Sequence, residues 1–382
     1  MKKLIVLLVS SLMFFTACGK KKDNNTQKPA NKKEIVEKKK AKPQKEEKKK
    51  QVTKTEDKEI KLPKSTVTQE QIDKLSEVFA YGDKLIEERK KLQKEISDLS
   101  KNFKDISAPL QLKKDAKYKY VSVTHFSNAV WTYIYKNDKK KSTERLFWIT
   151  VTYRYDLKDN KRYNEKFAGY DAIVFKNSGV WVLLKDSIEI RISANDESVK
   201  NEKAMEEVLK SFDLKSMESI FDKKTKFPKL KEYFLKIKEL NLKIQEVNKK
   251  FKEKENDMIE AIKPFIRENE GILKGLDLSK KEYTTSNNVK ITAKKDNKNL
   301  FFVYIGRHEG FFGVISLFKG KNAKFKKVGS YKALLIDDKA SMIKLPTLVL
   351  KSATFYDNEY KNPQKLSEIL ANFDIDGLAK VK

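Results

Sequence analysis

The stretch NEKAMEEVLKSFD at residues 201–213 recurs as NPQKLSEILANFD at residues 362–374. Both stretches begin with Asn, carry Glu-x-Leu in the middle and end on Phe-Asp. The likeness extends without a gap over residues 170–220 and 331–381. The sequence therefore predicts a tandem duplication of one folded unit. Identical pairs include Tyr170/Tyr331, Ala172/Ala333, Leu184/Leu345, Asp196/Asp357, Lys200/Lys361, Asn201/Asn362, Glu207/Glu368, Leu209/Leu370, Phe212/Phe373 and Asp213/Asp374.

Each copy of the repeated stretch predicts a short helix that packs on a sheet. Leu209 and Phe212 lie three residues apart and fall on one helix face, and the second copy repeats this spacing. The predicted helices cover residues 202–212 and 364–372. Their apolar faces need a partner surface, which the preceding segments can supply.

Short segments of alternating hydrophobicity precede each of these helices. Residues 146–155 are the clearest case, because Phe147 and Ile149 share one face while Trp148 and Thr150 share the other. The short connections favour an antiparallel meander over a parallel sheet. The predicted strands are 118–125, 129–135, 146–155, 172–175, 180–184 and 188–192, and then 289–292, 300–305, 311–318, 333–336, 342–345 and 347–353.

A long amphipathic helix is predicted over residues 71–106. Apolar residues recur there every seven positions, from Val78 to Ile106. Gly82 and Arg89 interrupt the second apolar position of the heptad.

A second long helix is predicted after residue 228. From Leu230 to Phe251, apolar residues step by three and four positions, as in a coiled-coil seam. Pro264 is expected to bend or end this helix. We expect the seam to pair with the 71–106 helix of the same chain, and the alternative is that it receives a partner helix.

Together these elements predict an α+β protein. Each unit is expected to hold a long amphipathic helix, an antiparallel β-meander and a short C-terminal helix. The first unit is predicted at 71–220 and the second at 221–382.

The N-terminus carries an export signal. Lys2 and Lys3 precede an apolar run at residues 4–15, which is too short to span a bilayer, because a transmembrane helix needs about 20 residues. The run ends on Phe15-Thr16-Ala17-Cys18 and resembles the lipobox of bacterial lipoproteins. The resemblance implies a signal peptide at 1–17 and acyl chains, such as palmitate, on Cys18. An ordinary secretory peptide is the alternative.

Residues 18–70 have the composition of a tether. Residues 19–70 contain 18 Lys and 9 acidic residues but no aromatic residue. Such a segment buries too little apolar surface to offset the entropy of ordering, so we expect it to be disordered. We expect it to space the folded part from a membrane, and the same segment can also lie on anionic lipid, polysaccharide or peptidoglycan.

The sequence carries no signature of a common catalytic or cofactor site. The single Cys excludes a disulfide framework, and the glycines form neither a dinucleotide fingerprint nor a P-loop. His125 and His308 stand far apart without a visible partner, so both are interpreted as structural. Gly306, Gly310 and Gly313 predict a hairpin bend with bulges. We expect no metal and no cofactor.

Asp213 and Asp374 recur in both units, directly after a predicted helix. We expect each carboxylate to accept hydrogen bonds from nearby backbone at a turn. The alternative is a carboxylate pair in a glycan-acting hydrolase, which requires a defined separation between the two groups.

Aromatic residues and charge suggest two further interpretations. Trp131, Trp148 and Trp181 are expected to pack under a covering helix, and the alternative is a platform on which sugars or bases stack. The net charge of +30 is the excess of 84 basic over 54 acidic residues, and only 7 of the basic residues are Arg. Specific nucleic-acid sites depend on Arg, so we do not expect specific nucleic-acid binding.

A weak resemblance adds to this interpretation. The ending EEVLKSFDL at residues 206–214 is similar to the C-terminal end of PsbP-like and DcrB-like domains, which implies a sheet flanked by helices without a fixed activity. We expect a lipid-anchored, non-enzymatic binding or structural protein of the cell envelope, facing the periplasm or the cell surface. Its partner would be an envelope protein or an anionic glycan or lipid. The alternatives are an envelope glycan hydrolase and an assembly or chaperone-like factor.

Overall fold

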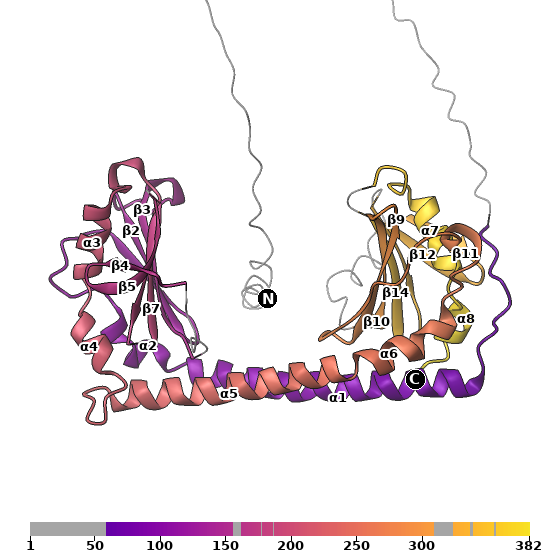
Figure 1. Cartoon of the computed structure of the whole chain (residues 1–382), viewed down its shortest axis with the longest axis horizontal. Helices are drawn as coiled ribbons and strands as arrows, with labels where there is room; N and C mark the ends of the chain where they lie inside the picture. The colour runs from indigo at the N-terminus through magenta and orange to yellow at the C-terminus, as the bar shows by residue number, and fades with distance from the viewer. Residues whose placement is uncertain are drawn as a thin grey trace, which may run out of the picture. The chain divides into compact units, whose positions relative to one another are not determined.

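The computed structural model describes residues 59–155, 162–176, 178–185, 187–308, 324–336, 339–354 and 357–382. The described residues form one compact unit. It is an α+β structure with two antiparallel seven-stranded sheets and helices (Figure 1). Cys18, Gly310, Gly313 and the predicted strand 311–318 lie outside the described residues.

The first sheet has the strand order β1-β2-β3-β7-β6-β5-β4, and the second has the order β11-β12-β13-β14-β10-β9-β8. The two sheets have the same strand order, because β1 to β7 of the first sheet correspond in sequence to β8 to β14 of the second. The first sheet contains β1 (Val121–His125), β2 (Ala129–Tyr135), β3 (Arg145–Tyr153), β4 (Glu165–Phe167), β5 (Tyr170–Phe175), β6 (Gly179–Leu184) and β7 (Ile188–Ala194). The second contains β8 (Lys281–Thr284), β9 (Asn288–Lys295), β10 (Lys298–Arg307), β11 (Lys324–Val328), β12 (Tyr331–Ile336), β13 (Ala340–Lys344) and β14 (Leu348–Ala353).

The sheets are not the simple meanders that the short connections predict. In the first sheet β3 pairs with β7, so two meanders, β1–β3 and β4–β7, join side by side. The physical reason is the polarity of β4, whose Glu165 and Lys166 are exposed and suit an edge position. The apolar strands β3 and β7 take the protected centre instead.

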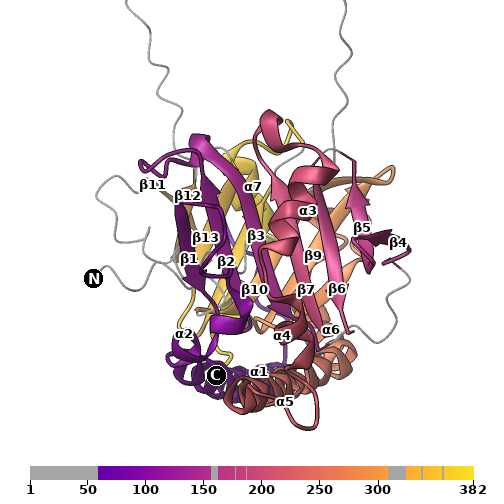
Figure 2. The ribbon, with the colours of Figure 1, turned by 90° about the vertical axis from the view of Figure 1, so that its left-hand side faces the viewer.

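Helices cover one face of each sheet and contribute to its core (Figure 2). We call the first sheet with its core the first lobe, and the second sheet with its core the second lobe. The helices are α1 (Gln69–Ser100), α2 (Phe103–Ile106), α3 (Glu202–Lys210), α4 (Leu214–Ser219), α5 (Pro228–Glu253), α6 (Glu255–Ile262), α7 (Pro363–Ala371) and α8 (Ile375–Leu378). No helix of the described residues is both long and apolar enough to cross a membrane.

The 71–106 helix differs from the prediction because it breaks after Ser100. The Ser100 hydroxyl donates to the Ile96 carbonyl at 2.6 Å, and α2 restarts at Phe103. Hydroxyls that bond back to the preceding turn in this way often bend a helix. The break places Phe103 in the core of the first lobe, where its ring lies 4.8 Å from that of Tyr233.

The long helices α1 and α5 pair within the chain, as predicted. Tyr233 Oη lies 3.3 Å from Ser100 Oγ, while Arg89 Nη1 lies 3.5 Å from Asn248 Oδ1, so the two helices run antiparallel. Six of the seven seam residues of α5 are buried. The helical path ends in a turn at Lys263–Phe265, which contains Pro264.

Each long helix contributes to both cores. Leu75 and Phe79 of α1 lie in the core of the second lobe, and the C-terminal part of α1 contacts the first through Leu99. Helix α5 does the reverse, with Phe234 in the first core and Phe251 in the second. The two lobes therefore share the same pair of helices.

Both interruptions in the α1 heptad have a structural cause. At Gly82, an added Cβ would lie 2.2 Å from Asn287 Oδ1, so only glycine allows this approach. Asn287 is fully buried and donates to the Phe79 carbonyl at 2.9 Å. Arg89 contacts Asn248 and lies 6.0 Å from the ring of Phe251.

Residues 59–68 form a segment that we call the strap. Composition assigns this segment to the tether, whereas in the structure it packs on the second lobe. Ile60 bridges to Val328 at the edge strand β11, and Leu62 contacts Gly329. Thr68 then caps α1 by accepting from the Gln71 N–H.

Candidate functional site: an aromatic face of the first sheet

All three tryptophans of the chain lie on one face of the first sheet, opposite its core. Residues of β3 alternate, with Phe147, Ile149 and Val151 buried in the core and Trp148 on the other side. The sequence predicts that the tryptophans pack under a covering helix, but in the structure they lie on the sheet face that is opposite the core. None of them belongs to a core cluster of the described residues, and all three are partly exposed.

Strand register lines these side chains up in rows. One row crosses four strands as Trp131, Thr150, Arg191 and Trp181. The next row crosses five strands as Tyr133, Trp148, Ser193, Gly179 and Phe175. Directly opposite side chains in a sheet stand about 4.5–5.5 Å apart. In each row, aromatic rings therefore flank small residues, and the first row also holds one arginine.

The rings form two contacting groups. In the first group, Trp131 lies 4.3 Å from Phe126 and 5.2 Å from Trp148 between ring centroids. In the second group, Phe175 lies 5.0 Å from Trp181 and is 39% exposed. Such packing holds the rings in place while one side of each group stays accessible.

An arginine stacks on each group. The Arg145 guanidinium lies 4.4 Å from the ring centroid of Tyr133, and the Arg191 guanidinium lies 3.9 Å from that of Trp181. A guanidinium over an aromatic face is stabilised by the ring quadrupole and still presents N–H donors at its edge. The face therefore combines flat apolar surfaces with fixed hydrogen-bond donors.

Glu189 holds Arg191 in this position. Its side chain is 1% exposed and accepts from Arg191 Nε at 2.5 Å and from Arg154 Nη1 at 3.2 Å. The Tyr163 hydroxyl donates to its second oxygen. Burial and this bond to a carboxylate raise the pKa of Tyr163, so the hydroxyl stays protonated. The network fixes the guanidinium over Trp181 before any ligand arrives.

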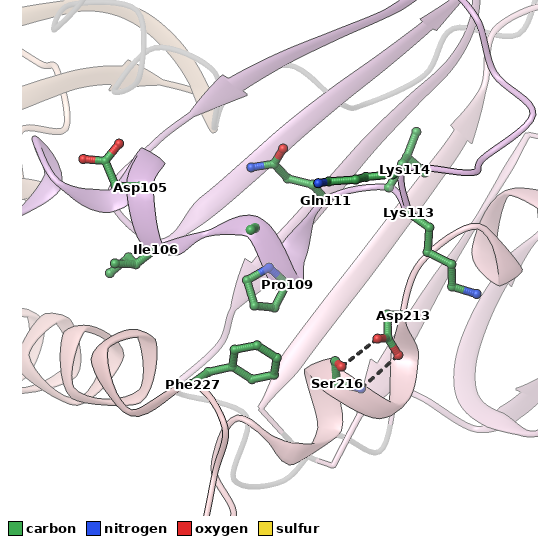
Figure 3. A pocket seen from close by; sticks show the side chains of 11 residues that line it. Asp105, Ile106, Pro109, Gln111, Lys113, Lys114, Asp213, Ser216 and Phe227 are labelled. Carbon is green, nitrogen blue, oxygen red and sulfur yellow. Dashed lines mark hydrogen bonds between the residues drawn. The ribbon is translucent and has the colours of Figure 1, made fainter.

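A cavity of about 500 Å³ lies elsewhere in the first lobe, between α2 and α4 (Figure 3). Asp213, Ser216, Lys113, Pro109 and Phe227 are among its lining residues. Asp213 caps α4, as predicted, because its carboxylate accepts from the Ser216 N–H at 3.2 Å. Hydrogen bonds from Ser216 lower the pKa of Asp213, and the slight burial of this exposed carboxylate does not offset them.

Both histidines contact neighbouring groups of the chain. His125 Nε2 lies 3.3 Å from Gln111 Nε2, and burial lowers the pKa of His125. His308 Nε2 contacts the carbonyls of Leu345 at 2.9 Å and Leu348 at 3.1 Å. Neither ring contacts the aromatic face.

Gly306 does not lie in a hairpin bend, which corrects that prediction. It lies within β10, opposite Asn288 of β9 and Val349 of β14. An added Cβ at Gly306 would lie 2.2 Å from the Asn288 Cβ, so the strand pairing itself requires glycine here.

Asp374 caps α8 and also binds the strap. Its carboxylate accepts from Gly377 N at 2.8 Å, Thr66 N at 2.9 Å and Ser65 Oγ at 2.9 Å. Arg267 Nη2 lies 3.7 Å from it. Asp213 and Asp374 thus cap helices in different lobes, and hydrogen bonds to other parts of the chain account for both carboxylates.

Acidification is expected to loosen the strap. Burial alone would raise the pKa of Asp374, but hydrogen bonds from Gly377, Thr66 and Ser65 outweigh burial, and the pKa is lowered. A carboxyl group with a lowered folded-state pKa contributes its full stability above the unfolded-state pKa of about 3.9. That contribution is lost as the pH falls through the folded-state pKa. The protection of the Thr66 amide against hydrogen exchange should therefore fall below about pH 4, and this pH dependence should vanish in Asp374→Asn.

Among the described residues, no group of three or more His, Cys, Asp or Glu side chains is placed to hold a metal ion. Comparison of the chain with protein-family models, with curated proteins and with solved structures finds no match. The assignment of function therefore depends on the geometry described above.

Proposed function

We propose that this protein is a lipid-anchored cell-envelope protein that binds glycan through the aromatic face of its first sheet. The anchor follows from the lipobox pattern at Phe15–Cys18, with acyl chains on Cys18. The binding role follows from the aromatic face, which is the single observation that carries the proposal. The protein acts by binding and not by catalysis.

Sugar rings fit the composition of this face. Each pyranose ring has a flat side of C–H groups, which packs on the negatively charged face of an aromatic ring. Trp131 and Trp181 flank Thr150 and Arg191 in one row and can each contact one such ring. Between them, the Thr150 hydroxyl and the Arg191 guanidinium can bond to sugar hydroxyl groups.

A protein partner fits less well. Protein interfaces are rich in Trp, Tyr and Arg, but their hot spots contain few Ser and Thr residues. Here Thr150, Thr152 and Ser193 lie on the central strands β3 and β7 of this face. Hydroxyls in this position favour a ligand that is itself covered with hydroxyl groups.

The similar strand order of the two sheets supports a tandem duplication, which we propose as the origin of the chain. Strand β12 lies at an offset of 161 residues from β5, and α7 lies at the same offset from α3. The aromatic rows do not recur with the duplication, since all three tryptophans belong to the first sheet. We propose that glycan binding is a property of the first lobe alone.

Titration of the full chain with soluble peptidoglycan fragments tests the glycan assignment. Tryptophan emission is a direct reporter, because every Trp of the chain lies on this face. We expect an emission shift on binding that persists in 0.5 M salt, where screening reduces interactions between exposed charges to a range of about 4 Å. Calorimetry should show at least about tenfold weaker binding for Trp131→Ala or Trp181→Ala, which corresponds to about 1.4 kcal/mol.

Leu235→Ala is the matched control, since Leu235 is 47% exposed on α5 and away from this face. It should bind like the wild type. Binding that disappears in 0.5 M salt, or that is unchanged in both tryptophan variants, would contradict the assignment. Cleavage of the glycan during the titration would favour the hydrolase alternative instead.

The anchor is tested separately. Metabolic labelling with a palmitate analogue is expected to mark the wild-type protein and to fail for Cys18→Ser. Label on the Cys18→Ser variant would show that another residue carries the lipid.

A further inference from the structure

Both lobes contain a corner of the same construction. In the first lobe, Leu112 forms an antiparallel bridge with Phe212, and the Lys113 N–H donates to the Ser211 carbonyl at 2.9 Å. Asp213 follows directly and caps α4. Lys113 and Asp213 therefore belong to adjacent chain segments at this corner.

The second lobe repeats each of these contacts. Ile266 bridges to Phe373, and the Arg267 N–H donates to the Asn372 carbonyl at 3.0 Å. Asp374 follows directly and caps α8. By these contacts Arg267 corresponds to Lys113, and Asp374 corresponds to Asp213.

In the second lobe this corner is occupied by an extended peptide, the strap. Asp374 accepts from the Ser65 hydroxyl and the Thr66 N–H. Arg267 Nη2 donates to the carbonyl of Lys64 at 2.8 Å. The acid and the base thus hold a short hydroxyl-bearing segment by its backbone and by one side chain.

In the first lobe the corresponding corner is the cavity of about 500 Å³ shown in Figure 3. Asp213 and Lys113 both line it, and Pro109 and Phe227 add apolar surface. The side chain of Asp213 is exposed to solvent, and within the described part of the chain its Oδ2 accepts from the hydroxyl of Ser216 alone, at 2.6 Å. A cavity of this size is within the range of small-ligand sites.

We infer that this cavity is a docking site for an extended peptide of a partner protein that carries a Ser or Thr side chain. The ligand hydroxyl and one N–H bond to Asp213, in place of the bond from Ser216. The Lys113 ammonium donates to a ligand carbonyl, as Arg267 does in the second lobe. Lys113 Nζ already donates to the Lys210 carbonyl at 3.0 Å, which leaves two further N–H groups for the ligand.

The differences between the two corners limit the length of the ligand. Val67 of the strap contacts Gly377, whose counterpart in the first lobe is Ser216. In the second lobe, Val67 directly precedes the cap of α1. In the first lobe, Phe227 holds the similar place directly before α5, and its side chain lines the cavity. The docked segment therefore corresponds to residues 63–66 and ends before the position of Val67.

A synthetic peptide with the sequence of residues 60–66, IKLPKST, and with blocked ends is the probe. Fluorescence anisotropy with the full chain in detergent should show saturable binding. Asp213→Asn keeps a good helix cap but removes the carboxylate, and Lys113→Met removes the ammonium group. Each substitution should weaken peptide binding at least fivefold, and a peptide with Ala in place of its Ser should lose a similar factor.

Two variants serve as controls. Asp196→Asn changes another capping aspartate of the first lobe outside the cavity and should bind the peptide normally. Trp131→Ala should also bind normally, which separates this site from the aromatic face. Absence of saturable binding at millimolar peptide would overturn the inference. Binding that is insensitive to Asp213→Asn but abolished by Asp374→Asn would also overturn it, because the peptide would then be replacing the strap.

Discussion

Replacing Phe79 by alanine is expected to lower the free energy of unfolding by about 3–5 kcal/mol. Phe79 is fully buried in the core of the second lobe, although it belongs to α1, the first helix of the described chain. The Arg307 guanidinium lies 5.2 Å from the ring centroid of Phe79, and the backbone carbonyl of Phe79 accepts a hydrogen bond from Asn287. The substitution therefore leaves a cavity where three segments of the chain meet.

Urea denaturation can test this prediction with two optical probes. Tryptophan emission reports on the first sheet, whereas far-ultraviolet circular dichroism reports on the whole chain. Because α1 and α5 contribute to both cores, we expect both signals to show the same shift of the midpoint. Phe175→Ala, at a ring that is 39% exposed, should change the stability by no more than about 0.5 kcal/mol. A urea midpoint of the tryptophan signal that is unchanged in Phe79→Ala would show that the lobes unfold independently.

Asp374→Ala is expected to cost about 3 kcal/mol, whereas Asp213→Ala should cost about 1 kcal/mol. Both residues cap a short helix, so each loses the capping bond. Asp374 is 1% exposed and also binds Ser65 and Thr66, and those donors would lose their partner. The loss of the hydrogen bonds from Ser65 and Thr66, at about 1 kcal/mol each, accounts for the difference between the variants.

Thermal unfolding of the two variants and the wild type is the measurement. Limited proteolysis adds a local readout, since cleavage within residues 59–68 should accelerate in Asp374→Ala and remain unchanged in Asp213→Ala. Equal losses of stability in the two variants would show that the strap contributes nothing to folding.

Several elements of the fold could be read from periodicity. Strand β2 has the bounds that alternation predicts, and β3 and α7 differ from their predicted bounds by one or two residues. The central apolar strands and amphipathic helices are predictable because one face of each is buried. The missed strands β4, β8 and β11 are short or rich in charged residues, and edge positions of this kind leave little hydrophobic signal.

The candidate site was only partly visible in the sequence. Alternation in 146–155 places Trp148 on the face opposite Phe147, and the same pattern in β6 places Trp181 opposite Val182. The prediction that the three tryptophans are covered assumed that a helix packs over this face of the sheet. Whether a helix covers a sheet face depends on contacts between distant segments, which alternation does not record.

The sequence by itself determined the central apolar strands and the amphipathic helices, the recurrence of the 201–213 stretch, and the lipobox pattern at Cys18, because each is encoded in neighbouring residues. Only the tertiary structure decided that β3 pairs with β7, that α1 serves both cores, and that the strap fills one Asp corner while the other stays open. These features depend on contacts between segments that are not neighbours in the sequence. Local patterns specify which side chains must be buried, whereas chain topology specifies the surface that buries them.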